Sequence, residues 1–258
     1  MADTLTHIQS RDNPWLKDLR RLAQDGAATR RQGRAWLEGD HLCRALLARG
    51  GQPEVAVYAQ SLWEQGGALA TTAGEVRTVV LPDALFQSIS ALESPARMGF
   101  VLPLPPAPAL DPGAATVVLD RLQDTGNVGA ILRCASAFGF RQVLALKGSA
   151  ALWSPKVLRA GMGAHFGLAL IESAEPGMLA DLAMPRLATS SHSGQWLHQA
   201  PLAWPCAWVF GHEGQGVSDA VAAHCTGSVR IVQPGGEESL NVATAAAICL
   251  HASAAART

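Results

Sequence analysis

The chain lacks the cysteine and histidine spacings that bind metals. Its five cysteines form no C-x-x-C pair, and its eight histidines show no H-E-x-x-H or paired C-x-x-C spacing. An odd number of cysteines in 258 residues also argues against a disulfide framework. We therefore expect neither a zinc site nor structural disulfides. We also expect the protein to reside in a reducing compartment.

Long apolar stretches are missing as well. No uninterrupted apolar run approaches the roughly 18 residues that a membrane span needs. Residues 1–14 lack the apolar core of an export signal, so the expected location is the cytoplasm. A hydrophobic content of 48% with 16% charged residues is typical of a folded globular protein with a substantial core.

Lysine is scarce, because 17 of the 20 basic residues are arginines. The net charge of −1 excludes a polycationic nucleic-acid binder, but the charge is unevenly placed. Residues 1–34 carry a net charge of +3 and residues 121–165 a net charge of +5, whereas residues 35–120 and 166–258 carry −5 and −4. Arginine suits bidentate phosphate contacts, although a GC-rich genome explains the excess of arginine equally well.

A proline-rich segment divides the chain. Residues 103–113 hold five prolines and no apolar periodicity, which is typical of a semi-rigid linker. We expect a first domain at residues 1–102 and a second at residues 114–258. In the first, the pattern predicts a helix from Asn13-Pro14 to about Gly26, a helix over 40–49, strands at 55–58 and 76–81, and a further helix from Pro82-Asp83. This is a small α/β domain.

Strands and helices alternate in the second domain, which predicts a mostly parallel sheet with helices on both faces. The expected strands are 116–119, 142–146, 168–171, 186–190, 207–210 and 229–232. The expected helices are 128–138, one from about 155, and 240–255. Sheets of this class bind ligands where loops leave the carboxyl ends of the strands.

Three loops after apolar strands concentrate glycine and polar residues, namely 120–133, 210–216 and 231–241. Each loop alone has a structural explanation, with glycines for turns and with Asn127 and Ser239 as helix N-caps. None completes the G-x-x-x-x-G-K-[ST] or G-x-G-x-x-G pattern of nucleotide-binding enzymes, and the chain has no G-x-S-x-G nucleophile elbow.

In this order and spacing, the three loops resemble the motifs of the SpoU (TrmH) family of RNA 2′-O-methyltransferases, in the SPOUT superfamily. The resemblance covers the whole second half of the chain. The matching positions are Asp124, Gly126-Asn127, Gly129, 131–133 and 137–139 in the first loop, 211–216 in the second, and 239–241 in the third. Residues 8–17 and 34–39 look like the amino-terminal substrate-binding domain of the rRNA-modifying members, which is similar to an L30e fold.

The resemblance implies an S-adenosylmethionine-dependent enzyme that methylates a ribose 2′-hydroxyl of structured RNA, ribosomal RNA before tRNA. It also implies a homodimer and a carboxy-terminal trefoil knot. The reaction centre is expected to contain Asn127, Arg133, Glu213, Ser239 and Asn241. The cofactor is expected against Thr189, Gly211, Ile231, Gln233 and Leu240. RNA is expected at Arg121, Arg141, Lys156 and Arg159, with Trp153 either stacking on RNA or packing in the core.

Two details of the resemblance need chemical interpretation. A guanidinium does not deprotonate in proteins, so we expect Arg133 to hold the target phosphate and stabilise the developing alkoxide, while the proton leaves through phosphate or water. The family usually has Ile-Pro-Met in its third motif, where this chain has Ile231-Val232-Gln233 and then Pro234. The loop beside adenine is therefore expected to differ in shape, and Ile231 and Leu240 have core packing as an alternative role.

Two other functions are alternatives that the sequence favours less. A non-catalytic RNA-binding protein would keep the charge pattern while losing Asn127, Arg133 or Asn241, and all three are present. A doubly wound dehydrogenase would need a complete glycine fingerprint, which the chain lacks.

Overall fold

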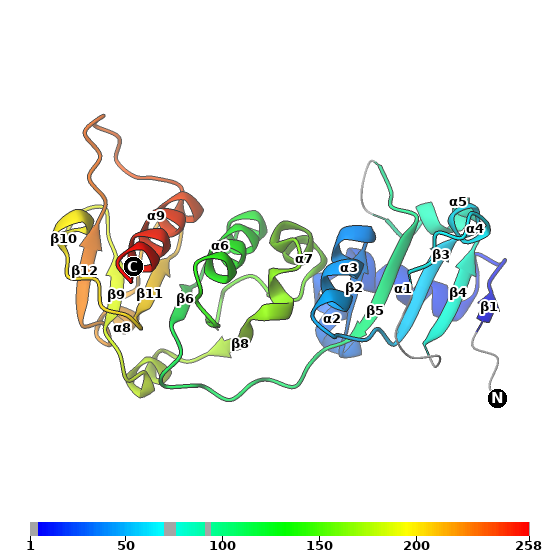
Figure 1. Cartoon of the computed structure of the whole chain (residues 1–258), viewed down its shortest axis with the longest axis horizontal. Coiled ribbons are helices and arrows are strands. Elements are labelled where there is room, and N and C mark those ends of the chain that lie inside the picture. Colours follow the sequence, from blue (N-terminus) through cyan, green and yellow to red (C-terminus); the bar gives the residue numbers. More distant parts are fainter. Residues whose placement is uncertain (1–4, 70–75, 91–93, 258) are drawn as a thin grey trace. The chain divides into compact units, whose positions relative to one another are not determined.

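The computed structural model describes residues 5–69, 76–90 and 94–257, which form two compact units (Figure 1). The first unit contains the chain up to residue 106 together with residues 153–166, and the second contains residues 107–152 and the chain from 167 onward. The division at 106 falls within the proline-rich segment. Residues 153–166, which the sequence placed in the second domain, pack with the first unit instead. Each unit is described by itself.

The first unit is built on a mixed five-stranded sheet of order β1-β4-β3-β5-β2. β4 is parallel to β1 and β3, whereas β5 is antiparallel to β2 and β3. The strands are β1 (Leu5–His7), β2 (Arg34–Glu38), β3 (Val55–Ala59), β4 (Arg77–Leu81) and β5 (Met98–Pro103). β3 and β4 were predicted, whereas β1, β2 and β5 were not. β2 and β5 pair with each other, from Arg34 opposite Pro103 to Glu38 opposite Gly99.

Helix α1 (Pro14–Gln24) begins as predicted, because the side chain of Asn13 accepts hydrogen bonds from the N–H groups of Trp15, at 2.9 Å, and Leu16, at 3.3 Å. A second helix, α2 (Gly26–Gln32), follows at once and was not predicted. The side chain of Asp25 caps it by accepting from the Ala27 N–H at 2.8 Å. Gly26 therefore starts a helix rather than ending one.

The remaining helices of the first unit are short, namely α3 (Asp40–Ala48), α4 (Gln60–Glu64), α5 (Asp83–Gln87) and α7 (Pro155–Gly161). α3 and α5 confirm the predicted helices at 40–49 and after Pro82, and α7 begins at Pro155 as expected. Leu16, Leu19 and Leu22 of α1 pack with Trp36 and other buried residues of the sheet. Burial of such side chains stabilises the unit by about 1.5 to 3 kcal/mol each.

The second unit is built on a seven-stranded sheet of order β10-β12-β9-β11-β6-β7-β8. All its recorded pairings are parallel, which confirms the predicted sheet type. The strands are β6 (Thr116–Asp120), β7 (Gln142–Leu146), β8 (Ala169–Ala174), β9 (Arg186–Thr189), β10 (Gln195–Trp196), β11 (Ala207–Gly211) and β12 (Gly227–Arg230). The two-residue edge strand β10 was not predicted.

Helices cover both faces of this sheet, as expected. On one face, α6 (Thr125–Ala137) packs against α9 (Val242–Ala255) (Figure 1). The indole N–H of Trp208 in β11 donates to the Ser253 hydroxyl of α9 at 2.9 Å. On the other face, the buried side chain of Val209 packs with Leu179 and Val221. These two belong to the short helices η2 (Pro176–Asp181) and α8 (Asp219–Ala222); η1 (Ala164–Gly167) and η3 (Leu197–Gln199) are single turns.

The starts of α6 and α9 correct two sequence-based interpretations. α6 begins at Thr125 rather than Val128, and its cap is Asp124, which accepts from the Asn127 N–H at 2.7 Å. α9 begins at Val242, and its cap is Asn241 rather than Ser239. The side chain of Asn127 is therefore available for contacts outside its own helix.

Two further observations bear on function. Within residues 5–69, 76–90 and 94–257, no helix has the length and hydropathy to cross a membrane. The same described residues contain no group of three or more histidine, cysteine, aspartate or glutamate side chains that would hold a metal ion.

Candidate active site

The first two sequence motifs begin next to each other. β6 and β11 are parallel neighbours, and their last residues, Asp120 and Gly211, are paired across the sheet. Because parallel strands end at the same edge of a sheet, the loop after β6 and the loop after β11 leave side by side.

Asp120 ties these two loops together. Its side chain is 2% exposed, and its carboxylate accepts hydrogen bonds from the Arg121 guanidinium at 3.1 Å and from the Ser218 N–H at 2.6 Å. A buried carboxylate is tolerated only when it is paired in this way. The sequence interpretation gave Asp120 no role, although a charged residue that ends an apolar strand was a usable signal.

Glycine is required at position 211 by the path of the second loop. A Cβ atom there would lie 2.0 Å from the carbonyl carbon of Gly216 and 2.1 Å from the nitrogen of Val217. The loop folds back on itself, with the Gly216 N–H donating to the His212 carbonyl at 2.8 Å. Any larger residue at 211 would displace this loop.

Glu213, at the tip of the second loop, contacts the first loop. Its carboxylate accepts hydrogen bonds from the N–H groups of Asp124, at 3.1 Å, and Gln123, at 3.4 Å, and from the side-chain amide of Asn127 at 3.3 Å. Partial burial acts to raise the pKa of Glu213, but hydrogen bonds from its own N–H, from Asp124, Asn127 and Gln123 outweigh burial and lower it. Glu213 is therefore ionised at neutral pH.

Asn241, from the third motif, completes the connection. Its amide nitrogen donates to the side-chain oxygen of Asn127 at 2.9 Å, and its own oxygen accepts from the N–H groups of Ala243 and Thr244 at the start of α9. The helix start orients the Asn241 amide, which orients Asn127, which turns its NH₂ group toward Glu213. One chain of hydrogen bonds thus joins a residue from each motif.

Arg133 and Ser239 are not part of this chain. Both side chains are exposed, and neither makes a recorded hydrogen bond or ion pair within the described residues. Arg133 lies on α6 six residues after Asn127, which places it about 240° around the helix. The structure therefore brings together three of the five predicted reaction-centre residues.

The predicted cofactor residues follow three adjacent strands. Thr189 ends β9, Gly211 ends β11, and Ile231 follows β12, in the sheet order β12-β9-β11. The Thr189 hydroxyl donates to the Val209 carbonyl at 3.0 Å. The side-chain oxygen of Gln233 is buried and has no hydrogen-bond partner in the parts of the chain that are described.

These positions fit a ligand that is apolar on one side and donates hydrogen bonds on another. Leu240 is 36% exposed and Val232 is 51% exposed, so the loop after β12 presents apolar side chains that nothing covers in the described structure. The buried acceptor of Gln233 needs a donor. An adenosine with a cationic amino acid attached has both properties.

The predicted RNA-binding residues have different surroundings. Arg121 is held by Asp120 and also donates to the Gln215 side chain at 3.0 Å, on a backbone with φ of 60°. Arg141 is exposed before β7. Lys156 is exposed and Arg159 half-buried on α7, in the first unit. The four predicted RNA-binding residues therefore belong to both units, two to each.

Trp153 is not available for stacking on RNA. It is 8% exposed, and its ring lies 5.4 Å from the ring of His165. Of the two roles expected for Trp153, packing is correct.

Comparisons with known proteins agree with this architecture. The model of the SpoU rRNA Methylase family matches residues 114–251. The chain is 31% identical to the uncharacterized tRNA/rRNA methyltransferase slr1673 of Synechocystis over 97% of this chain and 94% of that protein. It is 27% identical to the 23S rRNA (guanosine(2553)-2′-O)-methyltransferase RlmP of Bacillus subtilis over 96% and 98%. A solved TrmH-family structure from Porphyromonas gingivalis superposes with a TM-score of 0.81 at 33% identity, covering 92% of this chain and 96% of that one.

Proposed function

Because the chain belongs to the SpoU rRNA methylase family, we propose that it methylates a ribose 2′-hydroxyl of structured RNA, with ribosomal RNA as its substrate. The observation that carries the proposal is the chain of hydrogen bonds through Glu213, Asn127 and Asn241, which unites three motifs at one edge of a parallel sheet. The name of the B. subtilis relative supports both the 2′-O position and rRNA. A tRNA substrate is the second candidate, because the name of the Synechocystis relative gives tRNA and rRNA side by side.

S-adenosylmethionine is the proposed methyl donor, and the residues after β9, β11 and β12 would hold it. It supplies a methyl group already activated by a sulfonium, so the protein has to align the reactants and help a proton leave. Gln233 offers its unpaired oxygen to a donor, and Leu240 offers an apolar surface for adenine. Gly211 permits the path of the loop that lies beside them. Thr189 and Ile231 would form the neighbouring wall.

The residues of the first motif would act on the RNA. Glu213, ionised, fixes the amide of Asn127, so that Asn127 presents a preorganised dipole to the acceptor ribose. Arg133 would hold the target phosphate and stabilise the developing alkoxide, and Ser239 would complete the acceptor side. The proton would leave through phosphate or water, since a guanidinium stays protonated.

Two measurements test this function. In isothermal titration, S-adenosylhomocysteine is expected to bind and NAD is not; no heat with either ligand would favour a non-catalytic RNA-binding protein. Mapping of alkali-resistant 2′-O-methyl positions in a deletion strain and its parent is expected to show one site missing from ribosomal RNA. A site lost from tRNA instead would support the second candidate, and identical maps of both RNAs would contradict the proposal.

We also propose that the protein is a homodimer. α9 has no charged residue in its 14 residues, and Ile248 on it is 37% exposed. A helix without charged side chains usually packs against partners on more than one side. Light scattering after gel filtration is expected to give twice the chain mass, and Ile248→Asp is expected to give monomers; a monomeric wild-type protein would contradict the proposal.

Three further expectations remain proposals. They are cytoplasmic location, RNA contact by the amino-terminal unit, and a trefoil knot in the second unit. Fractionation of cells that carry a tagged protein tests the first.

A further inference from the structure

A cavity of about 500 Å³ opens in the first unit, far along the sequence from the motifs of the second. Its lining comes from α1, α2, β2 and β5. The volume lies within the range of about 300 to 1,000 Å³ that is typical of small-molecule sites. Nothing in the reaction proposed above uses it.

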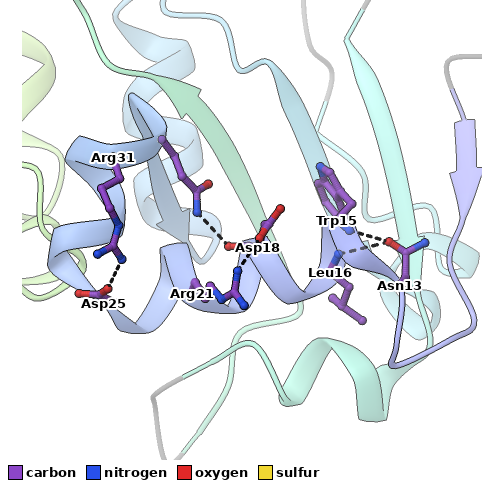
Figure 2. A network of polar contacts seen from close by, with 8 residues as sticks. Asn13, Trp15, Leu16, Asp18, Arg21, Asp25 and Arg31 are labelled. Atoms are coloured by element: carbon purple, nitrogen blue, oxygen red, sulfur yellow. Dashed lines mark hydrogen bonds and ion pairs between the residues drawn. The ribbon is translucent and has the colours of Figure 1, made fainter.

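The rim of the cavity is rich in arginine. Arg21 and Arg31 line it, and their side chains are 69% and 66% exposed. Arg21 is paired with Asp18 at 3.1 Å and Arg31 with Asp25 at 2.7 Å (Figure 2). Exposed pairs of this kind contribute little stability, so a stronger anion can replace the carboxylates.

These two guanidiniums also keep spare donors. Each has five N–H groups, and in the described residues each gives one of them to its acidic partner. Arg34, on the same rim, is different, because its Nε and Nη2 both donate to Glu54, at 2.7 and 2.6 Å. Both of these donors of Arg34 are thus used by a bidentate contact with Glu54, whereas Arg21 and Arg31 have donors left that can bind a phosphate.

The lining of the cavity is both polar and apolar. Leu19, Leu22 and Val101 form its floor but are at most 4% exposed, so Trp15 supplies most of the apolar surface that a ligand can reach. The half-buried indole of Trp15 forms a wall, and the Arg77 guanidinium lies 5.3 Å from its ring centroid. A planar ring can lie on such a surface.

One polar group sits beside this floor. The Gln32 side-chain nitrogen donates to the Asp18 carbonyl at 3.3 Å, which leaves its oxygen as an acceptor for an amino group. A half-buried indole, an amide acceptor and two guanidiniums with spare donors together match a nucleotide, which has a flat base, amino or imino donors and a phosphate.

We propose that this cavity binds one unpaired nucleotide of the RNA substrate, with its phosphate at Arg21 and Arg31 and its base against Trp15. The inference rests on the proposed function for its choice of RNA. Bases inside an RNA duplex are stacked and paired, so the site would select a loop, bulge or single strand.

A charge-matched comparison tests the phosphate contact. The variant is Arg21→Gln with Arg31→Gln, and the control is Arg44→Gln with Arg49→Gln. Both control residues are exposed and neither lines the cavity, and Arg44 is also paired with an aspartate, Asp40, at 2.8 Å. The probe is a fluorescent single-stranded RNA octamer, titrated by anisotropy at several salt concentrations.

The double variant is expected to bind the octamer about tenfold more weakly than wild type. Its slope of log K against log salt is expected to fall by about 0.7, since the two guanidiniums hold one phosphate and one phosphate contact on a single strand accounts for about 0.7. The control variant is expected to change neither quantity measurably. Equal binding and equal slopes for the double variant and the control would overturn the proposal.

The position of the base is tested through Trp15. Its indole N–H resonance, identified by its loss in Trp15→Phe, is expected to shift with the octamer and with adenosine monophosphate, and to stay in place with a fully paired RNA duplex. A shift as large with inorganic phosphate alone would show an anion site rather than a nucleotide site and would overturn the proposal.

Failure here is distinguishable from failure of the enzyme assignment. If wild type methylates ribosomal RNA while the double variant binds the octamer normally, the cavity proposal fails and the proposed function stands. If wild type methylates no RNA but the double variant loses octamer binding, the cavity binds RNA and the proposed reaction fails.

Discussion

At the residue scale, Asn127 is the side chain on which the candidate site depends most. It lies between an acceptor, Glu213, and a donor, Asn241, so both ends of its amide are used. The sequence motif indicated that Asn127 matters, but its neighbours along the chain equally predicted a helix cap. The structure separates these roles because Asp124 is the cap.

Replacing Asn127 by Ala is expected to lower kcat on the order of 100-fold, as loss of a preorganised dipole does in other enzymes. Affinity for S-adenosylhomocysteine is expected to change little, since the predicted cofactor residues lie on other loops. The matched control is Gln123→Ala, because Gln123 contacts Glu213 through its backbone N–H. Single-turnover methylation of RNA measures both variants, and equal rates would contradict the role given to Asn127.

Glu213 gives a prediction for pH. Its pKa is lower in the folded protein than its ordinary value of about 4.3. The stabilisation from the ionised form is therefore complete above the ordinary pKa and is lost as pH falls through the lowered one.

The melting temperature of wild type is expected to exceed that of Glu213→Gln by a constant amount from pH 7 to about pH 5. The difference is expected to shrink in more acidic solution. Thermal melts at matched ionic strength measure it. A difference that grows on acidification would have the wrong sign for this assignment.

At the scale of elements, the start of α9 serves both stability and the site. Asn241 caps the helix through its oxygen and holds Asn127 through its nitrogen. A single residue therefore couples the helix to the reaction centre, and substitutions can separate the two functions.

Asn241→Asp is expected to keep the cap, since aspartate is as good an N-cap as asparagine, and to lose the donor to Asn127. Its melting temperature should stay close to that of wild type while kcat falls. Asn241→Ala loses both functions and is expected to cost about 1 kcal/mol of stability as well. If Asn241→Asp were as active as wild type, the contact with Asn127 would have no role in the reaction.

The two helices at the amino terminus show which helix boundaries can be predicted from adjacent residues. Asn13 and Pro14 predicted the start of α1 correctly, because capping depends on adjacent residues. The break between α1 and α2 was missed, because Gly26 is equally compatible with the end of one helix and the start of another. The carboxylate of Asp25 decides it.

At the scale of the whole molecule, the two basic segments of the sequence are distributed differently. In residues 1–34, whose net charge is +3, Arg21 and Arg31 line the cavity of the first unit. In residues 121–165, whose net charge is +5, Arg121 and Arg141 belong to the second unit, and Lys156 and Arg159 lie on α7 in the first. Arg121 is committed to Asp120 and Gln215, whereas Arg141 and Lys156 are exposed.

We expect Arg141→Gln with Lys156→Gln to lower the salt slope of binding to a structured rRNA fragment by about 1.4 to 1.8, from two lost phosphate contacts. The rate at saturating RNA should change little, because neither residue contacts the reaction centre of the described structure. Filter binding at several salt concentrations measures the slope, and an unchanged slope would remove both residues from the RNA surface.

The sequence alone predicted the parallel sheet and the order of the three motif loops, because these depend on periodicity and on residues close together in the chain. The residues of the candidate site were implied by the resemblance of these loops to a family, not by periodicity. Only the tertiary structure decided that Asp120 joins two loops, that Glu213, Asn127 and Asn241 form one hydrogen-bonded chain, and that Trp153 is buried. The partners in these contacts are as many as 114 residues apart, and pairing at that distance is set by how strands order in the sheet.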